Sequence, residues 1–172
     1  MNNPTIAIRQ ATAADIPAIR KVAAIAFPTT YADILSPSQI DYMMDWMYSA
    51  ESLAEQFSEQ TFFVAEETDG AMVGYASFHR DAASPRPRPT YHLEKLYVLP
   101  QQQGRHLGSR LMDCVIEAIR AQGQPAVLEL NVNRRNPALE FYLHKGFAIA
   151  RTGDFAIGNN YYMCDHIMAL EI

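Results

Sequence analysis

A turn rich in glycine and basic residues, residues 101–109, has the composition of an anion-binding site. It connects a predicted strand to the start of a predicted helix, where unpaired backbone N–H groups and the helix dipole favour a negative charge. Gly104 and Gly108 allow the backbone to approach a phosphate closely. Further donors come from Arg105, His106 and Arg110. No acidic residue lies between Glu94 and Asp113, so the turn favours a pyrophosphate although the whole chain is acidic.

The same turn has a second interpretation, because two glycines also suit a tight strand-to-helix connection without a ligand. No Gly-Lys-Ser/Thr follows the glycines, so the turn is not a Walker A loop. The dinucleotide pattern G-x-G-x-x-G is also absent, which excludes a nucleotide oxidoreductase. A structural turn and another kind of phosphate site both remain open.

Two segments resemble the GNAT superfamily of acyl-CoA-dependent N-acyltransferases. Residues 103–108 are similar to the acyl-CoA signature Q/R-x-x-G-x-G/A, with His106 where the family usually has glycine. The backbone N–H donors survive this change if the main chain is helical there. Residues 133–147 are similar to the stretch N-x-x-A-x-x-F-Y-x-x-x-G-F, and the resemblance covers nearly the whole chain. The matching residues of this second segment are Asn136, Phe141, Tyr142, Gly146 and Phe147.

Three shorter segments look most like a bacterial branch that includes polyamine acetyltransferases. They are residues 31–36, 96–100 and 165–168. The resemblance implies acetyl-CoA as co-substrate, no metal, and a primary amine of a small polyamine-like or amino-acid-like molecule, or of a peptide, as acceptor. A homodimer would be common for such folds by analogy.

The resemblance assigns the chemistry to two side chains. Forming an amide from a thioester needs a neutral amine, and an alkylamine with a pKa of about 10.4 is almost entirely protonated at neutral pH. Glu94 is the candidate proton acceptor, with a solvated strand glutamate as the alternative. Tyr142 is the candidate acid, because a phenol can protonate a departing thiolate with a pKa of about 8.5. The alternative for Tyr142 is simple helix packing.

The resemblance also outlines a coenzyme A site. The backbone of Leu96 and Val98 would pair with the pantetheine arm as an extra strand, and a main-chain N–H would polarise the carbonyl. Asn136 would bond the pantetheine or a water, although it equally suits a helix N-cap before Pro137. Lys145 is expected near the ribose phosphate or simply in solvent. The full expected set is Leu96, Tyr97, Val98, Gln103, Gly104, Arg105, His106, Leu107, Gly108, Ser109, Asn136 and Lys145.

Recognition of the acceptor is expected from segments far from the turn. These are residues 28–31, the helices around Trp46, and the last strands near Tyr161 and Tyr162. Asp33 and Asp165 are conceivable anchors for an amine, with caps or turn residues as the alternative. Cys114 falls in a helix interior, so we expect direct transfer and no acyl-cysteine intermediate.

The predicted elements alternate between strands and helices. Strands are expected at 6–10, 61–66, 72–78, 92–99, 126–132, 146–150 and 160–170. Helices are expected from a Thr12 cap to about residue 27, in one or two pieces over 37–57, at 107–121 and at 137–145, with 28–31 breaking the first. This order implies a mixed α/β (α+β) fold: a mostly antiparallel sheet of about seven strands flanked by helices, with one β-α-β crossover at the glycine turn.

The composition suits one globular domain over residues 1–172. Hydrophobic residues make up 49% and charged residues 19%, which excludes a disordered chain. A net charge of −5 gives no basic field for nucleic acid. Cys114 and Cys164 form no C-x-x-C pattern, so neither a disulfide nor a metal site is expected. Without a leader pattern at Met1 or an apolar run of roughly 20 residues, we expect a cytoplasmic protein that does not associate with membranes.

Two non-enzymatic alternatives stay open. A sensor that binds acyl-CoA would keep the turn without turnover, which the histidine in the signature allows. The presence of both Glu94 and Tyr142 favours an enzyme. A partner-binding domain could instead use the apolar stripe at residues 42–47.

Overall fold

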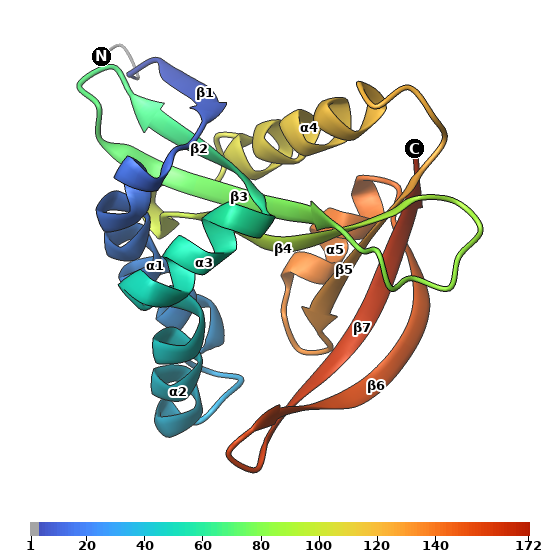
Figure 1. Cartoon of the computed structure of the whole chain (residues 1–172). Coiled ribbons are helices and arrows are strands. Elements are labelled where there is room, and N and C mark those ends of the chain that lie inside the picture. Colours follow the sequence, from blue (N-terminus) through green and yellow to red (C-terminus); the bar gives the residue numbers. More distant parts are fainter. Residues whose placement is uncertain (1–3) are drawn as a thin grey trace.

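The computed structural model describes residues 4–172, and Met1–Asn3, at which the leader pattern was expected to be absent, lie outside the described part. Residues 4–172 form seven strands and five α-helices (Figure 1). The strands are β1 (Ile6–Gln10), β2 (Thr61–Glu67), β3 (Met72–Arg80), β4 (Thr90–Val98), β5 (Val127–Asn133), β6 (Ala148–Gly158) and β7 (Tyr161–Glu171). The helices are α1 (Ile16–Tyr31), α2 (Pro37–Tyr48), α3 (Ala50–Glu59), α4 (Leu107–Arg120) and α5 (Ala138–His144). The expected fold class is confirmed.

All seven strands form one sheet in the order β1-β2-β3-β4-β5-β7-β6. Neighbours are antiparallel except β4 and β5, which are parallel and joined by the α4 crossover. Their pairing ends at Leu93 and Leu130, whereas β4 continues to Val98 along β3 and β5 continues to Asn133 along β7. The two central strands therefore diverge, and the sheet opens between them.

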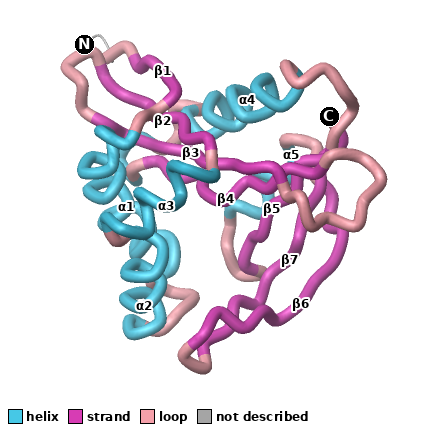
Figure 2. Tube along the Cα trace, in the orientation of Figure 1, coloured by secondary structure: helices cyan, strands magenta, loops and turns pink. Residues whose placement is uncertain are grey.

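The helices cover the two faces of the sheet, as the tube view in Figure 2 shows. On one face, Phe27 of α1 packs with its ring 5.8 Å from that of Tyr97 on β4. On the other face, Leu111 of α4 lies against Gly74 and Val98, next to Tyr97 in the strand. Successive strand residues point to opposite faces, so α1 and α4 lie on opposite sides of β4.

The expected break at residues 28–31 was wrong, because α1 runs through Pro28 to Tyr31. A proline inside a helix removes one backbone donor, which is a local loss. Here Phe27 and Tyr31 are both buried, with ring centroids 4.7 Å apart, and anchor the last turn to the core. The hydroxyl of Thr30 also donates to the carbonyl of Ala26 at 2.9 Å. Tertiary packing thus outweighs the proline.

β6 is longer than the strand expected at 146–150, since it continues to Gly158. It lies at the edge of the sheet and pairs only with β7, so most of its residues are exposed and the apolar alternation is weak. Asn159 and Asn160 both have positive φ, 52° and 59°, and close the hairpin to β7.

Three expectations from the sequence concern a membrane span, a metal site and the apolar stripe. No helix in residues 4–172 is long and apolar enough to span a membrane. The same residues hold no cluster of three or more metal-ligating side chains. Of the predicted apolar stripe at 42–47, Met43 is buried, whereas Trp46 is 50% exposed.

Candidate active site

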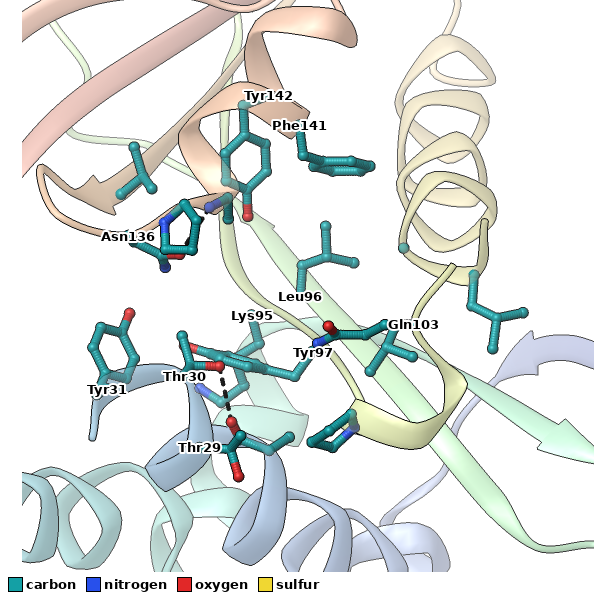
Figure 3. Close-up of a pocket in the computed structure, with 18 of the residues that line it drawn as sticks. Thr29, Thr30, Tyr31, Lys95, Leu96, Tyr97, Gln103, Asn136, Phe141 and Tyr142 are labelled. Carbon is teal, nitrogen blue, oxygen red and sulfur yellow. Dashed lines mark hydrogen bonds between the residues drawn. The ribbon is translucent and has the colours of Figure 1, made fainter. Parts of the chain in front are cut away.

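A cavity of about 970 Å³ fills the opening between β4 and β5. Its walls are the end of α1, the second half of β4, the end of β5, the turn before α4, and the start of α5 (Figure 3). Most predicted site residues line it: Glu94, Leu96, Tyr97, Val98, Gln103, Gly104, His106, Leu107, Gly108, Ser109, Asn136 and Tyr142. Two do not, Arg105 and Lys145. Segments far apart in the sequence therefore meet at this cavity.

A β-bulge sets the directions of the side chains on β4. Ser77 of β3 pairs with Lys95 and Phe78 pairs with Leu93, so Glu94 is the extra residue. A bulge increases the local twist and changes where side chains point, and such bulges are common beside active sites. Both Glu94 and Lys95 line the cavity as a result.

Glu94 is paired with a histidine that the sequence analysis did not include. Its Oε1 lies 2.8 Å from Nε2 of His79, and Nδ1 of that ring lies 3.1 Å from the carbonyl oxygen of Arg80. Both partners are acceptors, so the geometry suits a protonated ring, and the hydrogen bond to Glu94 raises the pKa of His79. Desolvation would raise the pKa of Glu94, but His79 together with His92 and Lys95 lowers it overall. Glu94 is therefore held ionised.

The turn before α4 presents main chain to the cavity. Gly104 has φ +82° and a Cβ there would meet nothing within 4 Å. His106 precedes the first residue of α4 with φ 58° and ψ 22°. This is the left-handed region, in which glycine is free of strain, so the backbone is helical but of opposite hand. The histidine at the signature position therefore has a backbone conformation that favours glycine.

The two arginines at the turn, Arg105 and Arg110, are engaged away from the cavity. Arg105 donates to the carbonyl of Pro4 at 2.8 Å and to Gln102. Arg110 donates to the carbonyl of Ile6 at 2.9 Å, which fixes β1 against α4. Any anion in the turn would therefore meet mainly backbone N–H groups.

Tyr142 reaches the cavity from α5 and points its hydroxyl inward (Figure 3). Its ring is clamped by Phe141 and Phe147, at centroid distances of 5.3 and 5.8 Å in edge-to-face geometry. The residue is 9% exposed, and burial raises its pKa above the ordinary value. The phenol is therefore protonated at neutral pH.

Asn136 and Lys145 both have structural contacts around α5. The side-chain oxygen of Asn136 accepts from the N–H of Ala138 at 2.9 Å, although Pro137 is the N-cap of α5. Lys145 donates to Ser109 at 2.9 Å and to Asp113 at 2.6 Å, which ties α5 to α4. Asn136 lines the cavity and keeps its amide NH₂ as a possible donor.

Lys95 was not among the predicted site residues, yet it lines the cavity with only 5% of the residue exposed. The available signal was strand alternation, which places Lys95 on the same face as Tyr97. Of the two conceivable amine anchors, Asp33 lines the cavity at an exposed position. Asp165 is buried behind Asn131, whose amide lies 3.2 Å from its Oδ2.

The fold and this cavity define a class, the GNAT acetyltransferases. The family model of the acetyltransferase (GNAT) domain matches residues 31–155, and the chain belongs to that family. It is an N-acetyltransferase with acetyl-CoA as co-substrate.

Particular relatives cover almost the whole chain. An uncharacterized N-acetyltransferase of Mycobacterium tuberculosis is 29% identical over 160 residues, which span 92% of this chain and 98% of the relative. The PaiA N-acetyltransferase of Thermoplasma acidophilum, solved in complex with coenzyme A, superimposes with a TM-score of 0.80 at 23% identity, over 98% of this chain and 99% of that one. A GCN5-related N-acetyltransferase of Rhodopseudomonas palustris gives 0.78 at 23% identity, over 100% and 98%. These solved structures share the fold.

Proposed function

We propose that the protein transfers the acetyl group of acetyl-CoA directly to a primary amine of a small molecule or peptide, with Glu94 as base and Tyr142 as acid. The observation that carries this proposal is the convergence of the two side chains on one cavity, from β4 and α5. The third wall of the cavity is the glycine turn that leads into α4.

The turn would hold the pyrophosphate of the coenzyme. Main-chain N–H groups near Gly104, His106 and Gly108, together with the positive end of the α4 dipole, supply the donors. The edge of β4 at Leu96 and Val98 is free of β5 and can pair with the pantetheine arm. Arg105 and Lys145 would then support this region through their contacts with Gln102 and Ser109.

Glu94 would accept the proton of the attacking amine. An ionised carboxylate is a weak base toward a free alkylammonium, so the amine must enter in its neutral form. When its nitrogen attacks the thioester carbonyl, that nitrogen becomes positively charged and far more acidic. Its proton can then pass to Glu94, which His79 keeps ionised.

Tyr142 would protonate the leaving group. As the C–N bond forms and the C–S bond breaks, the coenzyme departs as a thiolate. A phenol with a raised pKa remains a proton donor at any physiological pH. The products are the N-acetylated amine and coenzyme A in its thiol form; solvent then takes the proton from Glu94 and restores the proton of Tyr142.

The acceptor is proposed as polyamine-like, amino-acid-like or peptidic, with the polyamine branch as the narrower resemblance. We place the reaction in the cytoplasm, since Cys114 and Cys164 are both free. A homodimer is proposed by analogy with the fold.

The test is release of coenzyme A thiol from acetyl-CoA against a panel of amines headed by spermidine, with Tyr142→Phe in parallel. We expect release that depends on one class of amine, and a fall in kcat of about 100-fold in the variant. Tyr91→Phe is the matched control, since Tyr91 is buried like Tyr142, at 8% exposed, and does not line the cavity. Tight acetyl-CoA binding without release for any amine would contradict the proposed role and favour a sensor.

A further inference from the structure

Lys95 is a buried cation in the wall of the cavity. Only 5% of the residue is exposed, and within residues 4–172 no carboxylate lies within ion-pair distance of its ammonium. The ammonium instead lies over the ring of Tyr48, whose centroid is 5.3 Å from Nζ. The mechanism proposed above gives this lysine no part.

Burying a lysine without an anion is unfavourable, and buried lysines are normally paired. Desolvation lowers the pKa of Lys95 to about 8, so the side chain is still mostly protonated at neutral pH. The Tyr48 ring offsets a part of the cost through its π face. Ser77, the cross-strand partner, adds no neutralising charge, and its buried hydroxyl itself lacks a partner in the described chain.

The other charges of the cavity form no ion pair with Lys95. The neighbouring carboxylate of Glu94 raises the pKa of Lys95, but burial outweighs this effect, and the carboxylate is hydrogen-bonded to His79. Asp33 is exposed to solvent, where its charge is screened. Arg135 is a second cation of the lining, and it donates to the backbone oxygen of Asp33 at 2.8 Å.

Neutral hydrogen-bond donors accompany Lys95 on the same side of the cavity. Tyr31 and Tyr97 line it, and Figure 3 draws both near Lys95 and Thr30. Burial raises the pKa of each phenol, so both stay protonated, and the two hydroxyls also interact with each other. Lys95 and the two phenols line one cavity and are donors, which matches the needs of a carboxylate, an acceptor only.

We propose that the acceptor amine carries a carboxylate, which pairs with Lys95 and the phenols of Tyr31 and Tyr97. This inference rests on the proposed function and narrows its substrate to an amino acid or a similar amino-carboxylic acid. The amine would face Glu94 while the carboxylate fills the subsite at Lys95. A polyamine would instead bring a second ammonium toward Lys95, and like charges in a partly desolvated site repel.

The experiment compares acceptors in pairs. Each pair is an amino acid and the amine of the same carbon skeleton without the carboxylate, such as β-alanine with propylamine, and spermidine is included. Coenzyme A thiol release should show kcat/KM higher by about 10- to 100-fold for the better amino acids than for their amines. Lys95→Met should remove this preference for the amino acid, and Lys95→Arg should retain part of it. Lys21→Met, an exposed change on α1, should alter neither.

Binding provides a second measurement that needs no turnover. The N-acetylated products of the same pairs are titrated against the protein in the presence of coenzyme A. The acidic product should bind more tightly to the wild type and lose that advantage in Lys95→Met, whose folding is checked by its acetyl-CoA affinity. If no amine releases thiol but this difference persists, the proposed activity fails and the anion subsite stands.

Three results would overturn the inference. One is equal use of both members of every pair, and another is a preference for spermidine. The third is an equal loss of activity with both members in Lys95→Met, which would identify Lys95 as a base instead.

Discussion

Two walls of the cavity are built in different ways. The turn wall, residues 100–109, is one continuous segment that presents main chain, with its arginine turned away toward Pro4. The tyrosine wall, Tyr31, Lys95 and Tyr97, is assembled from the end of α1 and the middle of β4. A group common to every acyl-CoA can be held by backbone atoms, which any sequence supplies. Selection among acceptors needs particular side chains, and these come from separate elements.

The substitution with the largest expected effect is Glu94→Gln. The amide keeps the size of the side chain and loses the proton acceptor, so we expect kcat to fall about 100-fold. The KM for acetyl-CoA should change little, because the turn wall is untouched. Steady-state kinetics with both substrates would measure this, with Glu117→Gln on the exposed face of α4 as control. A rise in KM alone would contradict a role in proton transfer.

Gly104→Ala should produce the opposite pattern on the turn wall. A side chain at φ +82° is strained, so the turn should rearrange and the KM for acetyl-CoA should rise about tenfold. The kcat at saturation should be nearly unchanged. Gly70→Ala is a matched control, since Gly70 has φ +88° in open space in the β2–β3 turn. Equal kinetic effects in both variants would mean that only general stability is at work.

His79→Ala should change the pH dependence of the activity. His79 lowers the pKa of Glu94, so its removal lets that pKa rise, and the acid limb of kcat/KM should move to higher pH. As the pH is lowered, the variant should therefore lose activity at a higher pH than the wild type does, while its activity at neutral pH should change less. His79→Gln can still donate to Glu94 and should move the limb less. A pH profile with an unmoved acid limb would show that the pair does not govern the base.

The smallest expected effect belongs to His106→Gly. Glycine removes the strain of the left-handed backbone, so the free energy of unfolding should rise by about 1 kcal/mol, partly offset by the freer unfolded chain. The melting temperature should rise by about 2–4 °C. Acetyl-CoA affinity should be unchanged, because we propose that the turn wall binds the coenzyme through its main chain. Calorimetry would measure the melting temperature and a titration the acetyl-CoA affinity. A large loss of affinity would indicate that the imidazole contacts acetyl-CoA directly.

Local signals allowed prediction of much of the fold. The alternation of β2 and β3, the face of α4 and the glycines of the turn were all readable within short windows. The end of α1 was not, because burial of Phe27 and Tyr31 outweighs the breaking tendency of Pro28. The full length of β6 was missed because an exposed edge strand has little apolar alternation.

The sequence alone determined the family, and it predicted the β-α-β crossover and the two candidate catalytic residues. These depend on contiguous motifs, in which spacing along the chain is also spacing in the structure. Only the tertiary structure decided that Glu94 pairs with His79 across a bulge, that Arg105 points away from the cavity, and that Lys95 is buried beside Tyr97. The physical reason is that burial and hydrogen-bond partners depend on residues from other elements, whose approach no local pattern records.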